Sequence, residues 1–294
     1  MIRLAIISEG VNTWPVYVAQ EEGFFRRAGI KVDVTITRSS VKQLDELQKG
    51  GFDIGFQQAD HVVRAVENGS DLFACMAMAH APGLTLVGAR DVQGIAGLKG
   101  RTIAVDGGRT GYALLLRRLL ADRGLGEADY TFQEFGGSQE RFDALRAGAA
   151  AASWLNPPFD QRLLAEGFQS LTTTVQAFPD YPGPVAAARR SWAQAHEGEL
   201  VAFIRAFKSA YAWLQDGKNR EAAIRLLPAR LELDARAAAA GLAQMAARPQ
   251  PEITAAGLRQ VIDVYWAAEN LRTPKPAPDK YLDLSYLRGM KDEG

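Results

Sequence analysis

The chain of 294 residues contains only one cysteine and three histidines, which limits the chemistry it can perform. One cysteine excludes an internal disulfide framework, and Cys75 lies in an apolar run, 72–78, which predicts a buried and unreactive thiol. His61, His80 and His196 are far apart in the sequence and lack the spacing of metal ligands. We therefore expect neither a metal nor a cofactor.

Net charge and long apolar runs are also absent. The 34 basic residues balance the 34 acidic ones, so the composition gives no reason to expect nucleic acid or an anionic membrane as a partner. No apolar run approaches the roughly twenty residues that span a bilayer, and no direct membrane insertion is expected. The sequence has no Gly-x-Ser-x-Gly elbow and no phosphate-binding loop, which favours a protein that is not an enzyme.

An export leader is missing from the printed sequence. Residues 1–4 run directly into an expected strand, without the charged and apolar segments of a signal peptide. The protein is expected to be periplasmic if such a leader was removed, and cytoplasmic otherwise.

Apolar, strand-like runs alternate with helical periodicity through the first two-thirds of the chain, which predicts an α/β protein with mainly parallel sheets. The expected strands are 3–7, 30–36, 53–56, 72–78, 84–88, 102–105, 130–133, 150–154 and 184–188. The expected helices are 41–49, 58–68, 110–123, 138–147, 157–166, 198–216, 219–228, 234–247 and 254–270, preceded by one that begins on Thr13. A Pro-rich segment, 273–278, predicts an extended link to residues 281–284.

The first strand, helix and second strand carry a recognisable motif. Tyr17, Ala19, Gly23-Phe24-Phe25, Gly29-Ile30 and Val32 match the pattern aromatic-x-x-A-x-x-x-G-F-F-x-x-x-G-I-x-V, although the aromatic residue lies two positions before the alanine. Further matches are Gly51 to Gly55, Leu98 to Val105, and Ala147-Gly148 leading to 154–157. Together these motifs resemble the solute-binding proteins of nitrate, sulfonate, taurine and thiamine precursors over about the first two-thirds of the chain.

The resemblance implies a two-lobed fold of the periplasmic binding protein type II. Each lobe would be a mainly parallel sheet flanked by helices, with a ligand cleft between the lobes. Pro/Gly-rich crossings near 82–88 and 181–187 would divide the chain into lobe 1, residues 1–82 plus 187–294, and lobe 2, residues 88–182.

Candidate ligand contacts follow the strands, because ligands of open α/β sheets bind at the carboxyl ends of strands. The first set is Ser8, Glu9, Asn12, Thr13 and Trp14. We interpret Ser8, Asn12 and Thr13 as polar contacts and Trp14 as an aromatic wall; the alternative is an ordinary helix cap on Thr13 with Trp14 in the core. Glu9 would disfavour simple anions and favour a ligand that carries a donor or cationic group.

Two further sets lie after the next strands of lobe 1. Ser39 is either a ligand contact or the cap of the following helix. Gln57 and Gln58 can each donate and accept hydrogen bonds, which suits a polar ligand.

In lobe 2, Arg109 and Thr110 stand in a Gly-rich segment that opens a helix, which predicts an anion site unless Arg109 simply reaches solvent. Trp154 and Asn156 belong to the turn at 153–159 that matches the family. An Asp that often precedes this turn in the family is replaced by alanine within 149–152, so its role is not carried over.

These observations favour a protein that binds a small organic monoanion or zwitterion with an aromatic or heterocyclic body. The resemblance implies delivery to an ABC-type importer through its membrane permease. Two alternatives stay open: a cytoplasmic enzyme of the same fold, such as a thiamine-pyrimidine synthase or a lyase or decarboxylase of a small aromatic acid, and a cytoplasmic ligand sensor.

Overall fold

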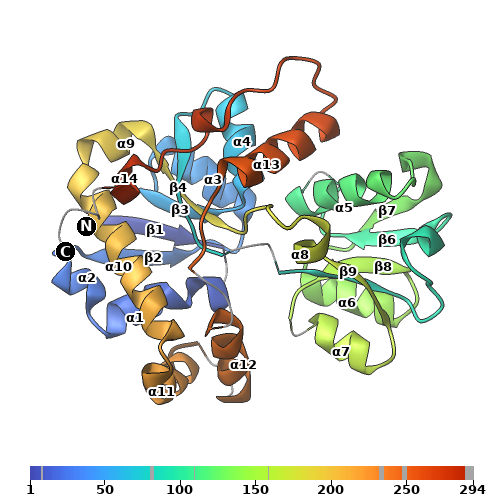
Figure 1. The fold of residues 1–294 in the computed structure, drawn as a ribbon, viewed down its shortest axis with the longest axis horizontal. Helices are drawn as coiled ribbons and strands as arrows, with labels where there is room; N and C mark the ends of the chain where they lie inside the picture. Colours follow the sequence, from blue (N-terminus) through green and yellow to red (C-terminus); the bar gives the residue numbers. More distant parts are fainter. Residues whose placement is uncertain are drawn as a thin grey trace. The chain divides into compact units, whose positions relative to one another are not determined.

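The chain forms two compact units, each built around its own sheet (Figure 1). Unit 1 comprises Met1–His80, Pro182–Ala255 and Ala277–Gly294, and unit 2 comprises Ala81–Tyr181 and Ala256–Pro276. The computed structural model describes residues 1–7, 9–79, 83–108, 110–157, 159–231, 235–246 and 250–288.

Unit 1 contains a five-stranded sheet in the order β2-β1-β3-β10-β4. Its strands are β1 (Ile2–Ile6), β2 (Val32–Ile36), β3 (Ile54–Gln57), β4 (Leu72–Ala77) and β10 (Val185–Arg189). β1 runs parallel to β2 and β3, whereas β10 is antiparallel to both of its neighbours, β3 and β4.

Unit 2 contains a second five-stranded sheet in the order β7-β6-β8-β5-β9. Its strands are β5 (Thr85–Gly88), β6 (Thr102–Val105), β7 (Thr131–Glu134), β8 (Ala152–Leu155) and β9 (Gln169–Thr173). β6 is parallel to β7 and β8, and β5 is antiparallel to β8 and β9. In each sheet the reversed strand, β5 or β10, is the first one formed after the chain passes from one unit to the other. The prediction of mainly parallel sheets flanked by helices is confirmed.

Helices cover both sheets. In unit 1 they are α1 (Trp14–Glu21), α2 (Phe24–Arg27), α3 (Ser40–Lys49), α4 (Ala59–Glu67), α9 (Arg190–Ala195), α10 (Glu197–Gln215), α11 (Arg220–Leu231), α12 (Ala235–Ala246) and α14 (Ser285–Arg288). In unit 2 they are α5 (Gly111–Asp122), α6 (Ser138–Arg146), α7 (Phe159–Ala165), α8 (Thr174–Ala177) and nearly all of α13 (Ala255–Ala268). None of the helices in the described part of the chain is both long and apolar enough to cross a membrane.

The core of unit 1 lies between its sheet and the adjacent helices α1 and α10 (Figure 1). Phe203 and Phe207 on α10 meet Phe25 and Phe56, with ring centroids 5.7 Å apart for Phe25 and Phe203 and 5.8 Å apart for Phe56 and Phe207. Burial of these aromatic side chains stabilises the packing of α10 in this core.

One segment differs from the predicted lobes. Residues 256–276 belong to unit 2, whereas the sequence placed all of 187–294 in lobe 1. Within unit 2, Gln260 on α13 donates to Asp180 at 3.5 Å. The apolar face of an amphipathic helix predicts that the helix packs on other elements, but not to which unit it belongs. The crossings near 82–88 and 181–187 stay a prediction.

The segment after α13 returns to the edge of unit 1. Leu282 forms a parallel bridge with Ala74 on β4, and the Ala74 N–H donates to the Tyr281 carbonyl at 2.8 Å. The Tyr281 ring is fully buried, and its hydroxyl donates to Glu67 Oε1 at 2.6 Å. The segment therefore covers part of an otherwise open sheet edge.

Replacing Tyr281 with phenylalanine tests this attachment. The change removes a hydrogen bond to a partly exposed carboxylate and keeps the buried ring, so we expect the free energy of unfolding to fall by about 1–2 kcal/mol. Urea unfolding followed by circular dichroism measures it. Tyr286→Phe, on a half-buried tyrosine of the same segment, is the matched control; equal effects of the two substitutions would contradict the assignment.

A second polar contact makes the stability of unit 1 depend on pH. Asp53 is buried and accepts hydrogen bonds from Arg3 Nε at 3.1 Å and from the Arg3 N–H at 2.8 Å. Burial raises the pKa of Asp53, but the hydrogen bonds from Arg3 outweigh it, so the pKa lies below its ordinary value. A lowered pKa stabilises the folded state above the ordinary pKa of aspartate, near 4, and this stabilisation is lost as pH falls through the folded value.

We therefore expect Asp53→Asn to cost about 1–2 kcal/mol at pH 7 and progressively less below about pH 4. Unfolding free energies of both proteins, measured from pH 7 down to pH 3, give the difference. Asp45→Asn, which breaks only an exposed pair with Lys49, should have little effect. A difference that does not change with pH would show that the Asp53 carboxylate charge plays no part.

Candidate functional site

Polar side chains gather at the carboxyl ends of the strands in both units. In unit 1, the first group lies in the turn after β1. Glu9 is exposed, and its carboxylate accepts a hydrogen bond from the Tyr17 hydroxyl on α1 at 2.8 Å. Asn12 is half-buried in the 3₁₀ turn Val11–Thr13. Ser8 lies outside the described residues. Glu9 is thus the charged group that the described part of this turn presents to solvent.

Thr13 does not cap α1 with its side chain, which corrects the predicted cap. Its hydroxyl donates to the Gly10 carbonyl at 2.8 Å, and the Gly10 N–H donates to that hydroxyl at 3.1 Å. The 3₁₀ turn continues into α1 at this point, so Thr13 already has helical backbone angles. Its Oγ1 therefore bonds to Gly10, before the turn, and not to an N–H of α1. At the other end, Gly23 follows α1 with φ of 73°, the left-handed conformation typical of a glycine at a helix end.

The two tryptophans proposed as aromatic walls lie in apolar cores. Trp14 is 2% exposed in the core of unit 1, and Trp154 is 1% exposed in unit 2. A Cβ atom on Gly241 of α12 would overlap the Trp14 ring, which shows how closely that helix covers it. Trp14 therefore lies where the alternative interpretation put it, in the core beside the helix start. An indole this deeply buried presents no face to solvent.

The polar residues after β2 and β3 mostly serve the fold. Ser39 caps α3, accepting from the Lys42 N–H at 3.2 Å. The buried Gln43 accepts from the Thr37 hydroxyl at 2.9 Å and donates to the Phe56 carbonyl at 2.7 Å. This pair ties the ends of β2 and β3 together. Sequence reasoning missed it, because a glutamine inside an amphipathic helix ordinarily faces water.

Gln57 is fully buried at the end of β3, beneath α4. Its Oε1 lies 2.8 Å from His61 Nδ1, while its Nε2 has no hydrogen-bond partner in the described structure. Gln58 is half-buried at the N-terminus of α4, without a side-chain cap bond there. An unpaired buried amide is costly, which marks Gln57 as a group with unused donor capacity.

In unit 2 the corresponding edge joins the ends of β6 and β7. Thr110 caps α5, accepting from the Ala113 N–H at 3.3 Å and donating to Asp106 at 2.6 Å. The Gly108 N–H donates to Glu134 Oε1 at 2.7 Å. Arg109, the predicted anion ligand, lies outside the described residues.

Arg141 on α6 is the functional candidate that sequence reasoning missed. It is 4% exposed, and it donates to the Trp154 carbonyl at 2.9 Å, the Ser138 hydroxyl at 3.1 Å and the Gly137 carbonyl at 3.2 Å. Ser138 in turn donates to Asn156 Oδ1 at 2.6 Å. All of these partners of the guanidinium are neutral oxygens. Burial lowers the pKa of Arg141, opposed by nearby negative groups of which Asp106 contributes most.

Charge and geometry at this edge favour an anion. Arg141 remains protonated at neutral pH, and the described residues place no carboxylate in an ion pair with it. The N-termini of α5 and α6 begin at the same sheet edge, where their free N–H groups also favour negative charge. A buried cation with only neutral partners is stabilised further by a bound anion.

The residues that could bind a metal ion or act as a nucleophilic thiol are histidine, cysteine, aspartate and glutamate. No group of three or more histidine, cysteine, aspartate or glutamate side chains among the described residues could hold a metal ion. Cys75 is fully buried, and burial raises its pKa to about 12. The prediction of a buried thiol is confirmed, and the raised pKa favours the unreactive thiol over the thiolate at neutral pH.

Comparison with known proteins gives a family and a fold. The model of the family described as "NMT1/THI5 like" matches residues 11–219. The periplasmic aliphatic sulphonate binding protein SsuA from Escherichia coli is 20% identical, with a TM-score of 0.77 over 95% of this chain and 96% of that one. No curated protein matches the chain at a significant level.

Two further structures are similar in fold. The alkanesulfonate-binding protein SsuA from Xanthomonas axonopodis pv. citri, bound to MOPS, is 19% identical, with a TM-score of 0.76 over 97% of this chain and 98% of that one. A DszB mutant in complex with biphenyl-2-sulfinic acid is 16% identical, with a TM-score of 0.69 over 98% and 99%. At these identities the similarities establish the periplasmic binding protein fold.

Proposed function

Because the chain belongs to the NMT1/THI5-like family, we propose that it is a solute-binding protein whose ligand is a small organic monoanion or zwitterion. The observation that carries this proposal is Arg141, a buried guanidinium with only neutral hydrogen-bond partners at the carboxyl ends of the unit 2 strands. A carboxylate, sulfonate or similar group would pair with this charge.

Glu9 limits the charge of the ligand. Its exposed carboxylate stands at the end of β1 in unit 1 and accepts one hydrogen bond, from Tyr17. A second negative group on the ligand would be repelled there, whereas an amine or another donor would be stabilised. An inter-lobe cleft as the place where the ligand binds remains part of the proposal.

The bound solutes of similar proteins support this ligand class. The Xanthomonas SsuA structure holds MOPS, and the DszB structure holds biphenyl-2-sulfinic acid. Each has one acidic sulfur group on an organic body that contains a ring. Our proposal extends this class to the present chain, without assigning its ligand to either compound.

The proposal has two further parts. The protein binds its ligand without converting it, and it delivers the ligand to the membrane permease of an ABC-type importer. Among the described residues, His61 is buried against Gln57, His196 stacks on Trp192, and the Cys75 thiol is fully buried. Delivery would follow from ligand-favoured closure of the lobes, which turns occupancy into a shape that a permease can recognise. A protein in this role would act in the periplasm.

Isothermal titration calorimetry with a defined panel tests the ligand class. The panel contains nitrate, alkyl sulfonates, MOPS, aromatic carboxylates, amino acids and aminopyrimidines. We expect the tightest binding from an organic monoanion or zwitterion, with the compound recovered unchanged. Tightest binding of nitrate or of an uncharged compound, or conversion of the bound compound to a product, would contradict the proposal.

A further inference from the structure

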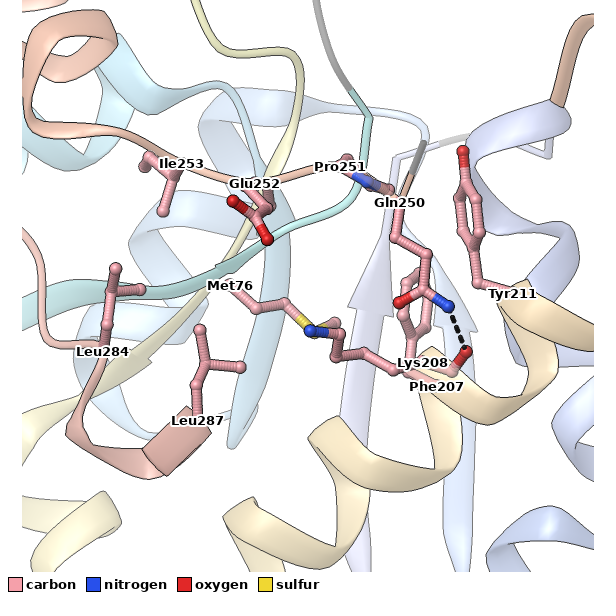
Figure 2. Close-up of a pocket in the computed structure, with 11 residues that line it drawn as sticks. Met76, Phe207, Lys208, Tyr211, Gln250, Pro251, Glu252, Ile253, Leu284 and Leu287 are labelled. Atoms are coloured by element: carbon pink, nitrogen blue, oxygen red, sulfur yellow. Dashed lines mark hydrogen bonds between the residues drawn. The ribbon is translucent and has the colours of Figure 1, made fainter. Parts of the chain in front are cut away.

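A pocket of about 300 Å³ lies entirely within unit 1, apart from the groups considered so far. Its wall is formed by the end of β4, one face of α10, the segment 250–253 and the C-terminal residues Leu284 and Leu287 (Figure 2). This volume is at the lower end of the range for small-molecule sites.

The pocket and the Gln57 group lie on opposite faces of the sheet. Met76 pairs with Ala186, which pairs with Phe56, so all three share one face, and Phe56 packs against Phe207 of α10. Gln57 is the next residue along β3 and therefore points to the other face, toward α4. A ligand in this pocket would not contact Gln57.

Two charged side chains and an apolar floor line the pocket. Lys208 on α10 and Glu252 in the connecting segment form no ion pair or side-chain hydrogen bond with any described residue, and they do not pair with each other. Figure 2 shows the Glu252 carboxylate extending toward the pocket interior. Met76 and Phe207 are buried and supply the apolar surface.

Gln250 adds a fixed acceptor. Its Nε2 donates to the Lys208 carbonyl at 3.2 Å, which orients the side-chain amide and leaves its Oε1 available (Figure 2). The pocket therefore offers one cation, one anion, an oriented amide oxygen and an apolar surface within a volume that suits a small molecule.

We propose that this pocket is a second ligand site, which binds a free α-amino acid with a branched or aromatic side chain. The carboxylate of the amino acid would pair with Lys208, its ammonium group with Glu252 and the Gln250 Oε1, and its side chain would cover Met76 and Phe207. A simple anion or a simple amine would satisfy one charge and leave the other unpaired, and an apolar compound would satisfy neither.

Calorimetry with the whole protein and L-leucine or L-phenylalanine as probes tests this site. We expect both amino acids to bind, and N-acetyl-L-leucine, L-leucinamide and glycine to bind at least tenfold more weakly, because each lacks one of the three complementary groups. Lys208→Gln and Glu252→Gln should each weaken leucine binding at least tenfold. Lys218→Gln, which alters an exposed lysine elsewhere in unit 1, should leave it unchanged.

The outcome is independent of the proposed main site. Arg141→Gln should leave leucine binding unchanged, and Lys208→Gln should leave the binding of the organic anion unchanged. Both variants of the pocket alter surface-accessible side chains, and an unchanged thermal midpoint confirms that they fold. If neither amino acid binds, if glycine binds as well as leucine, or if leucine binding depends on Arg141 and not on Lys208, the second site does not exist.

Discussion

Replacing Trp14 with alanine is expected to lower the free energy of unfolding by about 3–5 kcal/mol, the range for removing a large aromatic side chain from a packed core. The ring is 2% exposed at the start of α1 and packs beside Gly241 of α12. Its removal leaves a cavity beside Gly241, where the absence of a side chain already makes room for the indole. The helix start cannot collapse into that space, because the adjoining 3₁₀ turn is fixed by the Thr13 hydroxyl.

Urea unfolding, followed by near-ultraviolet and far-ultraviolet circular dichroism, measures the loss. Trp192→Ala is a suitable control, since that ring is half-buried and stacks on His196 at 5.2 Å, and it should cost clearly less. Trp14→Phe should recover much of the stability. If the alanine variant keeps its stability but binds the ligand more weakly, Trp14 is an aromatic wall of the ligand site and not a core residue.

Trp14 also shows where prediction from the sequence stops. Its position after the first strand and at the first turn of a helix was predicted correctly from local pattern. Its burial depends on α12, more than two hundred residues later in the chain, and a local pattern does not predict which helix covers which residue. Trp154 is a parallel case in unit 2.

The strands were predicted well, with one exception. Nine of them begin and end within two residues of the predicted bounds. β9 (Gln169–Thr173) was missed, because the sequence Gln-Ser-Leu-Thr-Thr is mostly polar and forms an edge strand that pairs only with β5. α11 continues through Pro228 to Leu231, past the predicted stop at 228.

Arg141 was missed for a reason of the same kind. The sequence 138–146 contains several charged residues, and an arginine in such a helix ordinarily reaches solvent. Only the fold reveals that this arginine turns inward to the Trp154 carbonyl, while Arg146 on the same helix is 55% exposed and pairs with Glu166. The anion site that the sequence predicts after a strand of lobe 2, on Arg109, lies outside the described residues and stays a prediction.

Arg141→Gln is therefore expected to weaken binding of an organic anion at least 30-fold, or about 2 kcal/mol, the lower range for truncating one partner of a buried charge pair. Glutamine retains a donor for the Trp154 carbonyl and removes the positive charge. Calorimetry with the sulfonate or carboxylate that binds the wild-type protein best measures the loss. Arg146→Gln changes an arginine on the same helix and should leave the affinity unchanged.

The structural role of Arg141 is separable from its role in binding. Loss of its hydrogen bonds to Trp154 and Ser138 should also lower the thermal midpoint, so the affinity is measured below the unfolding transition of the variant. Arg141→Lys keeps the charge without the planar fork, and we expect an affinity between those of the wild type and the glutamine variant. If a folded glutamine variant loses the same factor in affinity for anionic and for uncharged analogues, the substitution has distorted the site. A loss confined to the anion identifies the guanidinium as its counter-charge, and an unchanged affinity would remove Arg141 from the site.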